Sequence, residues 1–138
     1  MLGAAVILLL KPIAALAAWQ KEAFGAKSAP DALKSLGVGS TVPSQDVAIE
    51  APQIAENGAV VPIEITSNVR GTTSILVLVD KNPFPLVGKF DFSEGALPFV
   101  KLNLKMGETS DVRVIAEAGG RHYVATREIK VTIGGCGG

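Results

Sequence analysis

The residues most able to do chemistry lie at the C-terminus of the chain. Among 138 residues there is one cysteine, and it is flanked on both sides by glycines. A cysteine thiolate is a strong nucleophile that can hold a substrate in a covalent bond. Glycine has no Cβ and samples both signs of φ, so a glycine-rich segment is costly to order. We therefore expect a flexible arm that presents the thiol, formed by Gly134, Gly135, Cys136, Gly137 and Gly138.

Three jobs fit a thiol in this position. It could carry a substrate as a thioether, persulfide or thiosulfonate, it could form a lasting disulfide with a fixed partner, or it could be inert. An inert exposed thiol is a liability in an oxidising compartment, and a lasting disulfide does not need four flanking glycines. The pattern favours covalent carriage. From Ile133, expected as the last ordered and inward-facing residue, Cys136 would reach about 10 Å.

The sequence offers no general base beside the thiol. His122 is the only histidine, and it precedes Ile133 by eleven residues, at the start of the predicted strand that runs over 123–133. A strand of that span is about 35 Å long, so we expect His122 in a surface or turn role at the far end. No metal-ligand spacing, Ser–His–Asp arrangement or phosphate-binding loop stands out. We predict a chain without catalytic residues, cofactor or metal, whose thiol is activated in a partner's site.

The N-terminal 18 residues predict a secretory leader. Apolar runs over 2–10 and 13–18 flank Lys11-Pro12, and Ala15 and Ala17 offer small residues before a cleavage site. A membrane anchor is the alternative, but the apolar core is short against the roughly 20 residues that a spanning helix needs. No basic residue precedes Leu2, so we expect the natural chain to begin further upstream. We predict export, and no membrane anchor once the leader is removed.

Composition predicts one domain without an affinity for nucleic acid. Lysine plus arginine equals aspartate plus glutamate at 13 each, so no basic footprint for polyanions or anionic membranes exists. Residues 19–39 read as two short helices that cap an open end of the core. Residues 43–133 alternate apolar and polar, with a continuous apolar run over 74–79 that indicates a central strand. Pro62 indicates an edge strand or a late strand start.

These patterns predict an all-β fold, an immunoglobulin-like antiparallel β-sandwich with a helical N-terminal segment. Turns at 56–58, 69–71, 82–85, 93–95 and 119–120 separate the strands, and their Asn-Gly and Gly-Gly pairs suit positive φ. The residues expected to face inward are Ile63, Val77, Leu102, Val114 and Val131.

The strictly C-terminal motif over 134–138, entered directly from Val131-Thr132-Ile133, resembles the end of the Y subunit of the Sox thiosulfate-oxidising system. The segments 106–112, 82–85 and 19–36 also look like parts of that family. The resemblance implies an immunoglobulin-like sandwich that binds a Z subunit as a heterodimer in the periplasm. It implies that Cys136 carries sulfur intermediates of thiosulfate or sulfide oxidation, without a cofactor and without being an enzyme.

The same resemblance implies a set of partner enzymes. Haem-containing subunits would conjugate the substrate, a manganese-dependent hydrolase would release sulfate, and a sulfane dehydrogenase could oxidise the remaining sulfur. The main alternative is an interaction subunit joined to a partner through a disulfide at Cys136. A thiocarboxylate carrier is disfavoured because its core alternates strands with helices, and a stand-alone thiol enzyme lacks its base.

Overall fold

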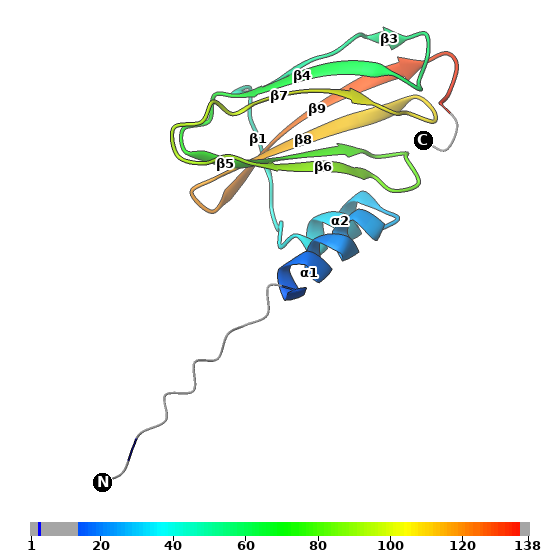
Figure 1. The fold of residues 1–138 in the computed structure, drawn as a ribbon. Helices are drawn as coiled ribbons and strands as arrows, with labels where there is room; N and C mark the ends of the chain where they lie inside the picture. The colour runs from blue at the N-terminus through cyan, green and yellow to red at the C-terminus, as the bar shows by residue number, and fades with distance from the viewer. Residues whose placement is uncertain (1–2, 4–13, 136–138) are drawn as a thin grey trace.

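The computed structural model describes residue 3 and residues 14–135, which form two facing β-sheets with two helices against one of them (Figure 1). This confirms the predicted all-β class with a short helical segment. Predictions about the leader at 1–18 fall largely outside the described residues, and the first helix already begins at Ala14. Within the described part of the chain, no helix has the length and apolar character to span a bilayer.

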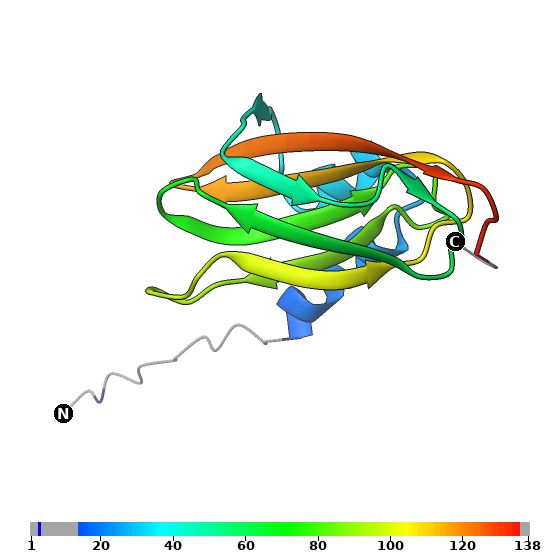
Figure 2. The same cartoon turned by 90° about the horizontal axis from the view of Figure 1, so that it is seen from above.

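The larger sheet has the strand order β1-β9-β8-β5-β6, and the smaller has the order β2-β4-β7 (Figure 2). Neighbours are antiparallel, except that β1 and the short β3 each pair with β9 in parallel. The strands are β1 (Val42–Pro43), β2 (Val47–Glu50), β3 (Ile54–Ala55), β4 (Val61–Ser67), β5 (Thr72–Val79), β6 (Leu86–Asp91), β7 (Phe99–Leu104), β8 (Ser110–Ala118) and β9 (Arg121–Val131).

The main core lies between the sheets, where the predicted alternation places it. Ile63, Val77 and Val114 are fully buried, and Leu102 and Val131 are half-buried and pack against the same cluster. Side chains alternate across a strand, so one face of each strand enters the core. The inward position predicted for Ile133 is wrong: it is 68% exposed because β9 ends two residues earlier, and the alternation ends with the strand.

Helices α1 (Ala14–Gly25) and α2 (Ala29–Ser35) cover the outer face of the larger sheet (Figure 1). The Ser28 side chain accepts a hydrogen bond from the Asp31 amide at 3.2 Å and caps α2, as its spacing predicts. The prediction that the helices cap an open end of the core is wrong. They bury a second apolar cluster, made of Ala23, Ala29, Ala32, Val38, Leu76, Leu78, Leu86 and Ile115.

This second cluster explains why β5 is apolar on both faces. Ile75, Val77 and Val79 enter the main core, whereas Leu76 and Leu78 lie under the helices. The strand lies between β8 and β6, so both its edges are paired as well. A continuous apolar run is typical of a strand covered on both faces.

Two local predictions need correction. The strand β4 that contains Pro62 is the middle strand of the smaller sheet and not an edge. Proline fits there because β2 pairs only with residues 64–67 of β4, which leaves Pro62 bordered by β7 alone in that sheet. Positive φ occurs as predicted in the Gly119-Gly120 turn but not at Gly58, whose role is different. It also occurs at Gly71 and Gly95, for which it was not predicted.

Candidate functional site

The last strand, β9, ends beside β3 at one end of the sandwich (Figure 1). Ala55 of β3 pairs with Val131, and the Thr132 amide donates a hydrogen bond to the Ala55 carbonyl at 3.1 Å. The Thr132 hydroxyl donates to the Glu56 carbonyl, also at 3.1 Å. The exit from the last strand is therefore tied to the loop that follows β3.

Beyond Thr132 the chain runs against two loops and forms backbone hydrogen bonds with both. The Gly58 amide donates to the Ile133 carbonyl at 2.7 Å, and the Met106 amide donates to the Gly58 carbonyl at 2.7 Å. The Gly135 amide then donates to the Met106 carbonyl at 2.9 Å. We call this arrangement, formed by residues 58, 106–107 and 133–135, the backbone clasp.

The clasp requires glycine for space. A Cβ at Gly134 would lie 2.0 Å from the Gly107 carbonyl oxygen, and one at Gly58 would lie 2.2 Å from the Met106 oxygen. A Cβ at Gly135 would lie 2.9 Å from the amide nitrogen and Cα of Ala59. None of Gly58, Gly134 and Gly135 has positive φ, so the missing side chain serves close backbone approach.

The receiving side of the clasp is anchored to the protein interior. The Met106 side chain is fully buried in the main core, while its backbone bonds to Gly58 and Gly135. The side chain of Asn82, which is 8% exposed, donates to the Lys105 carbonyl at 2.7 Å. Its oxygen also accepts a long hydrogen bond, 3.4 Å, from the Gly107 amide.

Sequence reasoning missed this network because its contacts are mostly between backbone atoms. The turn predicted over 82–85 was assigned only a rigid geometry, and Gly134 and Gly135 only flexibility. The sequence carries no direct signal for the network, because the glycines at 58, 107 and 134–135 are far apart along the chain and meet only in the fold. Cys136, Gly137 and Gly138 lie outside the described residues. The flexibility expected of Gly134 and Gly135 stays a prediction, although both pack closely against neighbouring backbone.

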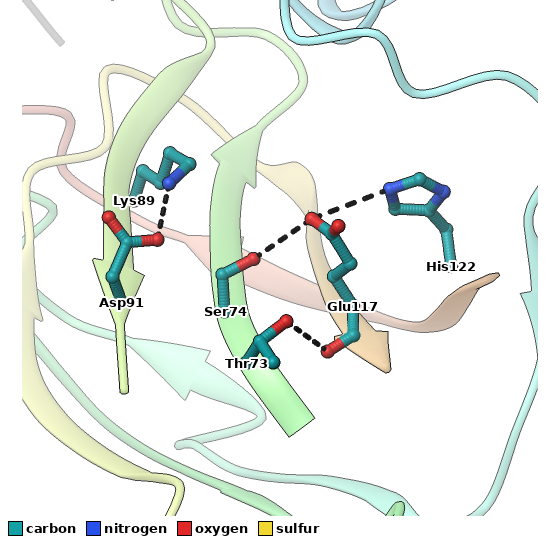
Figure 3. Close-up of polar contacts among 6 residues, drawn as sticks. All are labelled: Thr73, Ser74, Lys89, Asp91, Glu117 and His122. Carbon is teal, nitrogen blue, oxygen red and sulfur yellow. Dashed lines mark hydrogen bonds and ion pairs between the residues drawn. The ribbon is translucent and has the colours of Figure 1, made fainter. Parts of the chain in front are cut away.

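The opposite end of β9 holds the polar side chains that could suggest catalysis (Figure 3). The Ser74 hydroxyl donates to Glu117 Oε2 at 3.2 Å, and His122 Nε2 lies 3.7 Å from the same oxygen. A catalytic triad places the histidine between the nucleophile and the acid, but here the carboxylate lies between the other two. Ser74 therefore has no general base in this cluster, and its 3% exposure indicates a structural hydrogen bond.

His122 lies at the opposite end of the strand from the C-terminal segment, as the sequence predicts. It lies at the start of β9, whereas the clasp follows the end of that strand. The separation along the strand is about 30 Å at the usual rise per residue. Among residues 14–135 no group of three or more histidine, cysteine or acidic side chains is arranged to hold a metal ion.

Comparison with known proteins gives four results. Residues 33–136 match the family described as "Sulfur oxidation protein SoxY". The sulfur carrier protein SoxY from Chlorobium limicola f. thiosulfatophilum is similar in structure, with a TM-score of 0.69 and 37% sequence identity over 75% of this chain and 96% of that chain. An engineered protein matches with a TM-score of 0.43 and 15% identity over 63% of this chain and 20% of its own, too distant to bear on function. No curated protein matches the sequence closely enough to count as a relative.

Proposed function

The chain belongs to the SoxY family of sulfur oxidation proteins, and from this premise we propose that it is a carrier that holds sulfur intermediates covalently on Cys136. The observation that carries the proposal is the extent of the family match. It begins at residue 33 and ends at residue 136, so the matched region includes the thiol itself. A similar solved protein is described as a sulfur carrier protein.

The covalent chemistry requires a partner that accepts electrons. Joining the Cys136 sulfur to the terminal sulfur of thiosulfate forms one S–S bond, releases the thiol proton and removes two electrons. A haem-containing partner is the class that takes up these electrons. Attack by water on the terminal S–SO₃ bond then releases sulfate and two protons and leaves a sulfane sulfur on Cys136.

The surroundings of the C-terminal segment support a carrier over an enzyme. The nearest atoms to a Cβ placed on Gly134 or Gly135 are backbone atoms of Gly107, Gly58 and Ala59. Backbone groups position a chain but do not take up a proton at neutral pH, whereas nucleophilic catalysis needs an adjacent base. We propose that the base and the electrophilic groups come from the partner enzymes.

Family membership also motivates the proposed setting. We propose a periplasmic protein that forms a heterodimer with a Z subunit and visits haem-containing conjugating subunits. A manganese-dependent sulfate-releasing hydrolase and a sulfane dehydrogenase complete the set of proposed partners. A mobile C-terminal arm that bears Cys136 is the proposed device that takes the thiol from one site to the next.

The test is intact mass spectrometry of the protein purified from cells grown with thiosulfate, before and after reductant. We expect masses of added sulfur or of thiosulfate-derived groups that reductant removes. Peptide mapping should place every such addition on Cys136, the only cysteine in the chain. The matched control is Cys136→Ser, which changes one atom and should carry none of these additions.

The alternative function, a subunit joined by a disulfide, gives a different result. It predicts one stable adduct with a single partner protein on non-reducing gels and no exchange when thiosulfate is added. A bare thiol in cells oxidising thiosulfate would also contradict the carrier proposal.

A further inference from the structure

From the backbone clasp we infer that the pivot of the thiol arm lies at Gly135, and that Asn82 is a positioning residue for that pivot. The inference rests on the proposed function for its purpose, because a pivot matters only if the thiol is carried. The geometry rests on described residues alone. The first two glycines of the motif then act as a fixed base, and not as part of the moving arm.

The clasp divides the glycines of the motif by physical role. Flexibility alone would place no steric demand on Gly134, since any small residue permits motion. Its Cβ position, however, lies 2.0 Å from the Gly107 oxygen, a distance that real Cβ atoms do not reach. The oxygen belongs to the backbone and cannot move aside as a side-chain end could. Alanine at this position must therefore displace the chain from the clasp.

Hydrogen bonding closes the clasp on both sides of Gly134. The Ile133 carbonyl before it accepts from Gly58, and the Gly135 amide after it donates to Met106. Gly58 links the two loops because its own carbonyl accepts from the Met106 amide. These bonds offset the conformational entropy lost when the two glycines are ordered.

Asn82 holds the receiving loop in the geometry that the clasp needs. Its amide group bonds to Lys105 and Gly107, the residues on either side of Met106. The Met106 carbonyl, which accepts from Gly135, is therefore oriented by two flanking contacts to one buried side chain. Asn82 therefore acts on the arm through this loop.

The position of the pivot decides how far the thiol can reach. If the arm swung from the end of β9 at Val131, five residues would lead to Cys136 and span about 17 Å. A pivot at Gly135 leaves one Cα–Cα step of about 3.8 Å. The clasp therefore confines the thiol to the neighbourhood of the 56–60 and 105–108 loops. A partner site has to come to this end of the sandwich.

The experiment is amide hydrogen exchange of the purified full chain by NMR, without any sulfur substrate. We expect the Gly58 and Gly135 amides to exchange at least about fivefold more slowly than in an unstructured peptide, the factor that one net hydrogen bond supplies. Gly134→Ala should remove this protection from both amides. The matched control is Gly39→Ala, where a Cβ meets nothing within 4 Å and φ is not positive.

A second variant covers the case in which Gly134→Ala fails to fold. Asn82→Asp keeps the oxygen that faces the Gly107 amide but loses the donor to Lys105. It should lower protection of Gly135 while amides of the core strand β5 keep theirs. A nitroxide on Cys136 adds a readout that stability does not move: its relaxation effects should spread to more distant amides in Asn82→Asp.

Wild-type Gly135 exchanging at the rate of an unstructured peptide would overturn the inference. So would equal protection and equal relaxation footprints in wild type, Gly134→Ala and Asn82→Asp. These outcomes differ from failure of the proposed function, because neither measurement uses sulfur or a partner. A clasp that is present in a chain whose Cys136 is never loaded would refute the carrier proposal alone.

Discussion

The two ends of the sandwich are held together by different kinds of atoms. At the end that carries the C-terminal segment, Gly58, Met106 and Gly135 bond through backbone amides and carbonyls. At the other end, Ser74, Glu117 and His122 interact through side chains (Figure 3). Where backbones are in direct contact there is no room for a side chain between them. At the other end, side chains occupy the space between the strands.

The end proposed to be functional is therefore built from backbone contacts, and the other end from side-chain contacts. The end with the titratable side chains resembles an active site at first sight but lacks a nucleophile–base contact. The end with the clasp has almost no chemistry of its own within the described residues. Under the proposed carrier function, precise placement of the chain matters more than local reactivity, because we propose that the reacting groups come from partner enzymes.

The substitution expected to have the largest effect is Met106→Ala, at the end of the sandwich that holds the clasp. Truncating the fully buried side chain should lower the free energy of unfolding by about 2–5 kcal/mol. The loop should also shift, so protection of the Gly135 amide should fall with it. Urea unfolding and hydrogen exchange on the same samples measure both changes.

The matched control for Met106→Ala is Ile75→Ala, a fully buried residue beside Ser74 on β5. It should destabilise the protein by a similar amount and leave Gly135 protected under native conditions. If both variants change Gly135 equally, global stability and not local placement governs the clasp.

A smaller effect is expected from Ser74→Ala at the other end. Loss of the hydrogen bond to Glu117 should cost about 0.5–1.5 kcal/mol of unfolding free energy. Neither Gly135 protection nor sulfur loading should change, because the cluster lies at the start of the long β9 whereas the clasp follows its end. Reduced loading of Cys136 in this variant would reveal a functional link between the two ends.

The smallest effect is expected from Lys101→Met on the smaller sheet. Lys101 Nζ lies 2.9 Å from Glu64 Oε1, and this hydrogen bond and charge raise the pKa of Lys101 above its ordinary value of 10.5. A pKa raised by folding adds stability that is complete below pH 10.5 and is lost as the pH rises through the raised value. The side chain is exposed, so solvent screens most of the interaction.

Urea unfolding of wild type and Lys101→Met at neutral and alkaline pH measures this difference. It should be small at neutral pH and should disappear at alkaline pH. A difference that grows with pH would mean that another group, and not the Glu64 pair, responds to the substitution.

The sequence could predict most of the strands but not all of their partners. Alternation identified the inward faces of residues such as Ile63 and Val114, because burial on one face has a period of two. The parallel pairing of β1 and β3 with β9 was not predicted, because strands of two residues are too short to show periodicity. The position of the helices escaped as well, although Leu76 and Leu78 already showed that a second face of β5 needed a cover.

The sequence suggests the reactive atom of the candidate site, which stays a prediction, but it does not reveal the contacts that support the C-terminal segment. Cys136 follows from residue type and position alone. The clasp depends on how closely three chain segments approach one another. From the sequence alone, a glycine that is needed for close packing cannot be distinguished from one that is needed for flexibility. Asn82 looked like a turn residue because its long-range partners, Lys105 and Gly107, are backbone groups of a distant loop.

The two short parallel strands on β9 have a consequence for how this protein meets others. β1 pairs at Tyr123 and β3 pairs at Lys130, and between them Arg127 donates to the Ile49 carbonyl of the crossing strand β2. The outer edge of β9 is thus paired with a short strand near each end. It offers no long row of free amides and carbonyls to which another strand could bind. The two short strands therefore disfavour polymerisation of the protein through that edge of the sheet.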